Sequence, residues 1–153
     1  MSRNTDGFSL LEIIVAIAII GIITAISVAV FVNLHNTEAL RRDASSISSL
    51  LETARVHSLS SKNNEPYGVY IEDNESMVFS GSTFDPNNVI TRASLHSTVQ
   101  FDEITLTNST STVLFDKITG ATDNHGVIVL ESVRRAASST VSIEPTGSIT
   151  TDF

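Results

Sequence analysis

The longest uncharged stretch of the chain runs from Ile13 to Leu34 and consists almost entirely of apolar residues. A helix rises about 1.5 Å per residue, so this stretch would measure roughly 33 Å, which is enough to cross a hydrocarbon core of about 30 Å. The apolar run itself begins at Phe8. The pattern therefore predicts a transmembrane helix segment over residues 8–34.

A helical pattern continues beyond this stretch, but with apolar residues on one face only. Steps of four and three connect the residues of one stripe, whereas charged residues lie off it. Neither Pro nor Gly interrupts the chain from Ile22 to Lys62, so we expect one helix from about Phe8 to Ser60. The stripe consists of Leu40, Ala44, Ile47, Leu51, Ala54 and Ser58, and the charged residues off it are Arg41, Arg42, Asp43, Glu52 and Arg55.

From Lys62 onward the helical period disappears, and short runs rich in Val, Ile, Thr and aromatic residues alternate with turn residues. Such short antiparallel strands packed against a helix predict an α+β head over residues 35–153, covered by the second half of the helix. The strand candidates are residues 67–71, 77–80, 89–93, 98–101, 104–106, 113–115, 127–130, 140–143 and 148–151.

Composition limits the classes of protein that fit this pattern. The chain has 153 residues, so a leader and one span leave roughly 120 residues for a single small domain. Its net charge of −8 argues against a general surface for nucleic acid or anionic lipid. The chain contains no cysteine, so no disulfide stabilises the head.

Glu12 is the exception within the apolar run that begins at Phe8. A charged residue at mid-membrane costs roughly 2.5 to 3.5 kcal/mol, less near the end of a span, so a carboxylate there favours a cationic partner. The nearest cations along the chain, Arg3 and Arg41, lie outside the apolar run. Cleavage after Gly7 would create an ammonium group on Phe8, within about one helical turn of Glu12, and the pair could also form between neighbouring subunits.

A short polar leader ending in Gly7, then Phe8-Ser9-Leu10-Leu11-Glu12-Ile13 and a long apolar helix, resembles the prepilin signature of type IV pilins and type II secretion pseudopilins. The resemblance implies that a prepilin peptidase in the membrane cleaves between Gly7 and Phe8 and methylates the new amino terminus of Phe8. It also implies that Glu12 pairs with the terminal amine of a neighbour during assembly. Two features depart from the family: the leader, residues 1–7, is less basic than usual, and Ala29 stands where many pilins carry a proline.

Two further segments resemble the H-type minor pseudopilins and the related T-type minor pilins, namely residues 50–58 at the helix end and residues 141–150 at the last hairpin. Some T-type minor pilins take up DNA through a basic Gly-Arg-x-Arg motif in this hairpin. The corresponding residues here are Gly147-Ser148-Ile149-Thr150, which contain neither arginine. The pair Arg134-Arg135 offers little counterion release on so acidic a head, and we expect no nucleic-acid partner.

Other kinds of site find no support in the spacing of the residues. The histidines, His35, His57, His96 and His125, lack the short paired spacings of metal sites. The chain contains no Gly-x-Ser-x-Gly elbow and no glycine-rich phosphate loop. Acidic turns at 73–75, 85–88 and 123–124 offer oxygens to Ca²⁺ but do not match the EF-hand pattern, so solvated turns are the preferred interpretation. We therefore predict no catalytic residue, no metal site and no cofactor.

Together, these patterns predict a structural subunit, favouring a minor one, of a type IV pilus or type II secretion pseudopilus. Its leader would span residues 1–7, and its expected partners are prepilin peptidase, the membrane and other pilin or pseudopilin subunits. It would be a single-pass membrane protein before assembly and part of an envelope or extracellular filament afterwards. The alternatives are a major pilin that forms the fibre, and an uncleaved single-span membrane protein whose head binds an envelope partner. Charge bias around the span does not indicate its orientation.

Overall fold

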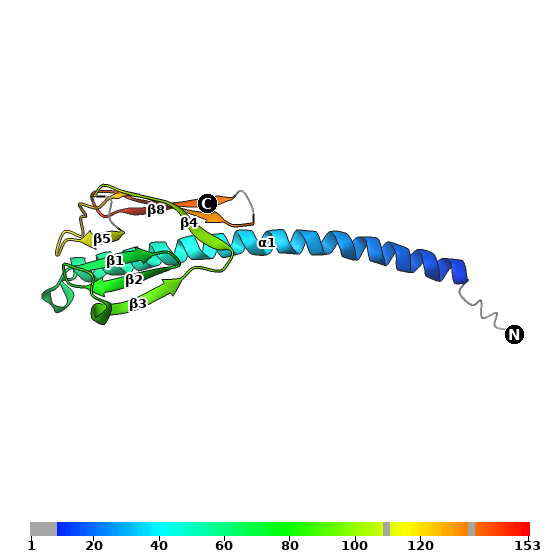
Figure 1. Cartoon of the computed structure of the whole chain (residues 1–153), viewed down its shortest axis with the longest axis horizontal. Coiled ribbons are helices and arrows are strands. Elements are labelled where there is room, and N and C mark those ends of the chain that lie inside the picture. The colour runs from blue at the N-terminus through cyan, green and yellow to red at the C-terminus, as the bar shows by residue number, and fades with distance from the viewer. Residues whose placement is uncertain (1–8, 109–110, 135–136) are drawn as a thin grey trace, which may run out of the picture. The chain divides into compact units, whose positions relative to one another are not determined.

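The computed structural model of the chain describes residues 9–108, 111–134 and 137–153, with residues 26–36 described by their backbone alone. The described residues form one long α-helix, two short 3₁₀ helices and eight β-strands (Figure 1). The chain divides into two compact units, Met1–His35 and Asn36–Phe153, and the helix α1 (Leu10–Leu59) contributes residues to both. The fold class is therefore α+β, as the sequence predicts.

Helix α1 begins and ends within two residues of the predicted limits, 8 and 60. Its last turn closes with backbone hydrogen bonds from Ser60 N to Val56 O (3.0 Å) and from Ser61 N to Ser58 O (2.9 Å). Ser61 then adopts a left-handed backbone conformation, with φ of 48°, and a left-handed residue cannot continue a right-handed helix. The helix therefore ends through backbone geometry, without a proline or glycine.

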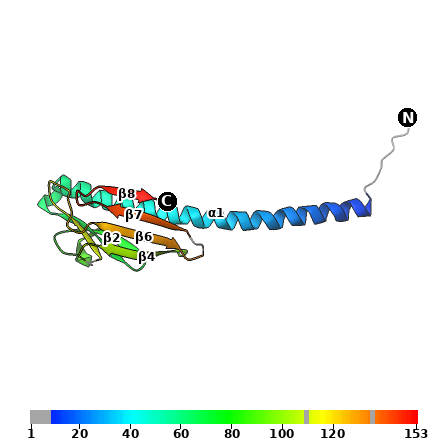
Figure 2. The same cartoon turned by 90° about the horizontal axis from the view of Figure 1, so that it is seen from above.

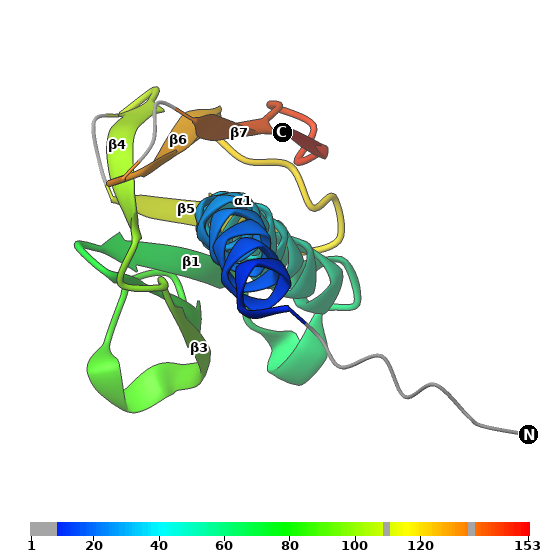
Figure 3. The same ribbon diagram turned by 90° about the vertical axis from the view of Figure 1, so that its right-hand side faces the viewer.

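The strands of the second unit form two antiparallel sheets, a division that the sequence did not predict. The first sheet has the order β3-β2-β1-β5 and the second the order β4-β6-β7-β8. Figure 2 shows β4, β6, β7 and β8 side by side, and Figure 3 separates the sheet containing β1 and β3 from the sheet containing β6 and β7. The strands are β1 (Tyr67–Glu72), β2 (Glu75–Ser80), β3 (Val89–Ser94), β4 (Val99–Leu106), β5 (Thr112–Phe115), β6 (Gly126–Ser132), β7 (Ser138–Ile143) and β8 (Ile149–Asp152), and the 3₁₀ helices are η1 (Lys62–Asn64) and η2 (Pro86–Asn88).

The predicted stripe of α1 is buried along its whole length, from Leu40 to Ser58. Its apolar members belong to one core cluster with residues of both sheets, among them Val69 of β1 and Leu130 of β6. Burying a Leu or Ile side chain stabilises a fold by roughly 1.5 to 3 kcal/mol, so the stripe contributes substantially to the head. Ser58, the polar member, accepts a hydrogen bond from Tyr67 N (2.8 Å), which connects the helix end to the first strand.

Asp43 corrects one expectation for the helix. The sequence places it off the stripe with the charged residues, yet only 8% of its surface is exposed. Its Oδ2 atom accepts a hydrogen bond from His96 N (2.7 Å), in the loop between β3 and β4. A buried carboxylate needs such a partner, and the loop supplies it from a position 53 residues away along the chain.

Strand β4 corrects the strand prediction, which divides it into residues 98–101 and 104–106. In the structure it is one strand, and the register with β6 shifts between Phe101 and Glu103. Asp102 is the additional residue of this β-bulge. In a regular strand Val99 and Leu106 would face opposite sides of the sheet, because an odd number of positions separates them. The additional residue of the bulge shifts the alternation by one position, so both side chains are buried. The broken alternation therefore marks a bulge within one strand.

Candidate assembly site

Glu12 lies in the first turn of α1. The carbonyl oxygen of Ser9 accepts hydrogen bonds from Glu12 N (3.0 Å) and Ile13 N (3.3 Å), and these bonds start the helix. The first turn leaves backbone N–H groups without helical acceptors, and the aligned peptide dipoles place positive partial charge there. This end of the helix therefore favours a carboxylate at position 12.

The spacing of Ser9 and Glu12 suggests a second role that the sequence analysis missed. Ser-x-x-Glu at a helix start is the capping-box pattern, in which each side chain serves a backbone N–H group of the other residue. Ser9 directly precedes α1, and Glu12 is its third residue. Glu12 can therefore support the helix start as well as carry a charge, and an experiment on its function has to separate these two roles.

The side chains around Glu12 are apolar and exposed. Those from Leu10 to Ile23 include Leu10 at 80%, Ile17 at 65% and Ile20 at 63% exposure. Together with Ile13, Ala16 and Ile17, Glu12 borders a shallow groove on the helix surface. A helix that is apolar on all sides belongs in an apolar environment, which a membrane or neighbouring helices can provide.

Two of the predicted site residues, Gly7 and Phe8, lie outside the described residues. Cleavage between them, and methylation of Phe8, therefore stay predictions, and so does the distance between the new amine and Glu12.

Among the residues that the structure describes, no helix combines the length and the apolar character needed to cross a membrane.

The described part of the head brings together no cluster of metal ligands. Within the described residues, no three His, Cys, Asp or Glu side chains lie close enough to hold a metal ion. The hairpin formed by β7 and β8 turns at residues 145–147, and Ser148 and Thr150 follow the turn at the two positions where the DNA-binding motif carries arginine. Within the described residues, the candidate functional site is therefore Glu12 with the apolar surface around it.

One comparison with known protein families finds a match, and the matched residues include Glu12. Residues 2–28 match the prokaryotic N-terminal methylation motif. This match supports the type IV pilin and pseudopilin family, and it points to a structural subunit that prepilin peptidase processes. No curated protein and no solved structure matches the chain.

Proposed function

We propose that the chain is a structural subunit of a type IV pilus or a type II secretion pseudopilus. Prepilin peptidase cleaves after Gly7 and methylates Phe8, residues 8–34 span the membrane before assembly, and the head faces outward. The match of residues 2–28 to the methylation motif carries the proposal. The exposed apolar surface from Leu10 to Ile23 supports it, because such a surface requires lipid or other helices around it.

Assembly through the helix gives Glu12 its proposed role. In a filament, apolar helices pack together, and the Glu12 carboxylate of one subunit meets the ammonium of Phe8 on a neighbour. A buried carboxylate without a partner is costly, so a subunit packs stably only where its Glu12 meets the Phe8 ammonium of a neighbour. The pair therefore fixes the position of each subunit along the filament. The partners are therefore other pilin or pseudopilin subunits, bound through this helix.

A minor subunit is the form that the sequence of the head favours, through residues 50–58 and 141–150, which resemble H-type and T-type minor subunits. A major subunit that forms the fibre itself is the alternative within the class. An uncleaved membrane protein whose head binds an envelope partner is the alternative outside it. The mature amino terminus distinguishes this last alternative from the other two.

The experiment compares Glu12→Ala with Glu12→Gln in the full chain. Both changes remove the charge, but glutamine also occurs in capping boxes and retains that function. We expect both variants to be cleaved and inserted normally and to be recovered poorly in sheared filaments. Removing one partner of a buried pair costs up to about 3 to 5 kcal/mol, and each 1.4 kcal/mol is a factor of about ten in association.

Glu38→Gln is the matched control, because Glu38 is an exposed glutamate on the same helix beyond the apolar run. It should assemble at the wild-type level. Wild-type assembly of both Glu12 variants would show that the pairing role is wrong. Loss in Glu12→Ala alone, with normal assembly of Glu12→Gln, would assign Glu12 to the helix start instead.

A further inference from the structure

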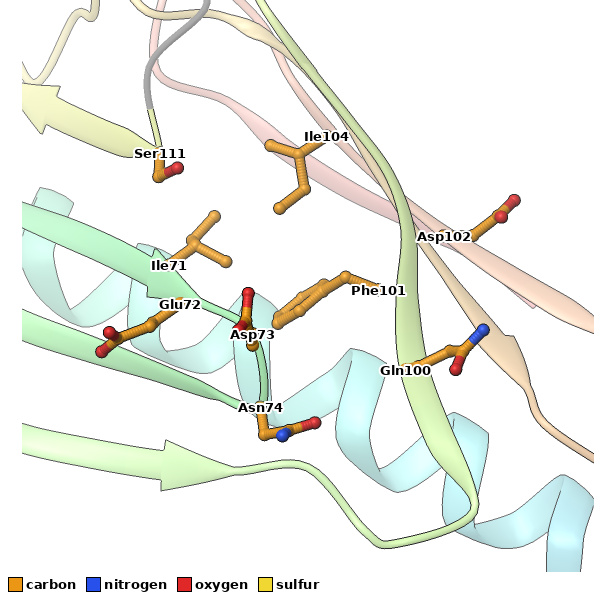
Figure 4. A pocket seen from close by; sticks show the side chains of 9 residues that line it. All are labelled: Ile71, Glu72, Asp73, Asn74, Gln100, Phe101, Asp102, Ile104 and Ser111. Atoms are coloured by element: carbon orange, nitrogen blue, oxygen red, sulfur yellow. The ribbon is translucent and has the colours of Figure 1, made fainter.

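A hollow of about 420 Å³ lies between β1 and β4, but it offers little apolar surface (Figure 4). Six of the nine side chains that line it are polar. Its Ile71 side chain is only 2% exposed, so it belongs to the core rather than to the surface. A more apolar surface of the head lies at the end of α1.

This surface combines the last turns of α1 with the loop between β5 and β6. Val56 and Leu59 are exposed and three positions apart, so they are neighbours on the helix. Ile118 N donates a hydrogen bond to Ser58 O (3.1 Å), and a Cβ atom on Gly120 would touch the Leu59 side chain, so the loop lies against the helix end. The side chain of Ile118 is itself 74% exposed. Val56, Leu59 and Ile118 are called the Ile118 surface below.

The backbone of Ile118 is strained, with φ of 71°. A β-branched residue rarely adopts this left-handed conformation, which persists only where the surrounding structure fixes it. Here Lys117 Nζ donates hydrogen bonds to Asn64 O (3.1 Å) and Oδ1 (3.0 Å), and Gly120 N donates one to Asp116 O (2.9 Å). Because the strained side chain is exposed, the strain adds nothing to the core of the head. Strain of this kind is typical of residues that contact a partner.

The first turns of α1 offer a surface that fits an exposed isoleucine. Glu12, Ile13, Ala16 and Ile17 border a groove of about 340 Å³. All four side chains are exposed, and three of them are apolar. The short side chain of Ala16 leaves room between Ile13 and Ile17 for a branched side chain. The groove therefore presents accessible apolar surface with one carboxylate at its edge.

Charge fits the same arrangement. Both lysines of the chain, Lys62 and Lys117, belong to the segments around the Ile118 surface. Glu12 is the only Asp, Glu, Lys or Arg from residue 9 to residue 34. The carboxylates of Glu65 and Asp116 lie in the same segments as the lysines, so charge orients such a contact and apolar burial drives it.

We propose that Ile118 of one copy of this chain docks in the groove beside Glu12 of a second copy, with Val56 and Leu59 against the adjoining apolar helix surface. The two docked surfaces differ, and a heterologous contact that does not close into a ring builds an open filament. A carboxylate has two oxygens, so Glu12 can meet the Phe8 ammonium in the same filament. The inference rests on the proposed function, because a head reaches the groove only after helices leave the membrane for the filament.

The first experiment is disulfide cross-linking of the full chain, which contains no native cysteine. One tagged copy carries Ile118→Cys, and a second, differently tagged copy carries Ala16→Cys in the groove. The control copy carries Ala18→Cys, the same substitution two positions further, which points to about the opposite side of the helix. In sheared filaments we expect several times more cross-linked dimer with Ala16→Cys than with Ala18→Cys.

The second experiment compares stability with assembly. Asparagine tolerates a left-handed backbone, so Ile118→Asn should raise the folding equilibrium constant of the full chain in detergent about fivefold. The same variant loses the docked side chain and should be recovered in sheared filaments about tenfold less than the wild type. Ile118→Val keeps a branched apolar side chain and should assemble normally. Ile90→Asn removes another exposed isoleucine, on β3, and should also assemble normally.

Equal cross-linking of Ala16→Cys and Ala18→Cys, or wild-type assembly of Ile118→Asn, would overturn the inference. An Ile118→Asn variant that is less stable and assembles poorly would assign Ile118 to the fold and overturn it as well. The amino terminus and filament recovery of the wild type are measured in the same cells. Cleavage at Phe8 and normal filaments without the specific cross-link reject the docking contact and leave the proposed function standing. A wild-type chain that begins at Met1 and forms no filaments rejects the proposed function itself.

Discussion

At the scale of single residues, Asp43 tests the packing of α1 against the head. Its carboxylate accepts a bond of 2.7 Å from His96 N, so Asp43→Ala should lower the free energy of unfolding of residues 36–153 by roughly 1 to 2 kcal/mol. Asp43→Asn keeps an acceptor and should cost less. Arg42→Ala, at an exposed neighbouring position, should change stability by less than about 0.5 kcal/mol. Urea unfolding measures all three, and equal stability of Asp43→Ala and Arg42→Ala would contradict the assigned contact.

His57 provides a prediction about pH. Its ring packs edge-on against Tyr67 with 5.0 Å between ring centroids, and its Nε2 atom lies 3.4 Å from Lys62 Nζ. Its Nδ1 atom is buried and has no hydrogen-bond partner among the described residues. Burial, and secondly the charge of Lys62, lower the pKa of His57 below its usual value of 6.5.

A lowered pKa in the folded state means that the unfolded chain binds a proton more readily. The stabilisation is therefore complete above about pH 6.5 and is lost as the pH falls through the lower pKa of the folded state. Unfolding measurements between pH 8 and pH 5 should show a fall in stability, and His57→Gln should reduce its steepness. An unchanged pH dependence in this variant would exclude His57 as its source.

Sequence periodicity predicted the buried residues of α1 well, because each turn of a helix repeats the same geometry. It could not predict the burial of Asp43, since this depends on a loop 53 residues away. The capping pattern of Ser9 and Glu12 was visible in the sequence. The apolar residues around Glu12 draw attention to its charge, and the capping role becomes evident only once the structure shows that α1 begins directly after Ser9.

At the scale of elements, the turn between β7 and β8 packs against the loop that precedes β6. Gly147 has φ of 77°, and a Cβ atom there would overlap the carbonyl oxygen of Gly120. Gly147→Ala should therefore destabilise the head by at least about 1 to 3 kcal/mol. Gly81→Ala is the control, because Gly81 also has a positive φ, but an added Cβ atom there would meet its nearest neighbour, Thr83 O, at 3.9 Å, an ordinary contact distance.

Thermal unfolding of the two variants separates two costs of an added Cβ atom. Both variants carry the strain of a positive φ, but only Gly147→Ala adds a steric overlap with the carbonyl oxygen of Gly120. Because the added Cβ at position 147 meets backbone that cannot rotate away, Gly147→Ala should lower the melting temperature more than Gly81→Ala. The opposite order would mean that the β7–β8 turn does not pack closely on Gly120.

Most strands could be predicted from the sequence because alternation and turn residues are local signals. The two segments assigned to β4 were joined by a bulge at Asp102, which breaks the alternation without ending the strand. The division into two sheets could not be predicted either. It depends on pairings between distant strands, such as β1 with β5 and β4 with β6, which local patterns do not specify.

The whole molecule combines an apolar N-terminal helix with an α+β head. The match to the methylation motif covers residues 2–28, so it supports the processing of the chain rather than the fold of the head. The head has a core of its own over residues 36–153. Whether this head is carried on a processed pilin-type helix therefore depends on the chemistry at Gly7 and Phe8.

Mass spectrometry of the intact chain, purified from membranes of cells that contain prepilin peptidase, shows whether this processing occurs. We predict a mature amino terminus at Phe8 that carries an N-methyl group. Gly7→Val should block cleavage and leave the precursor intact, because the bulkier side chain changes the residue before the cleavage site. A wild-type chain that still begins at Met1 in these cells would mean that the chain is not a processed pilin-type subunit.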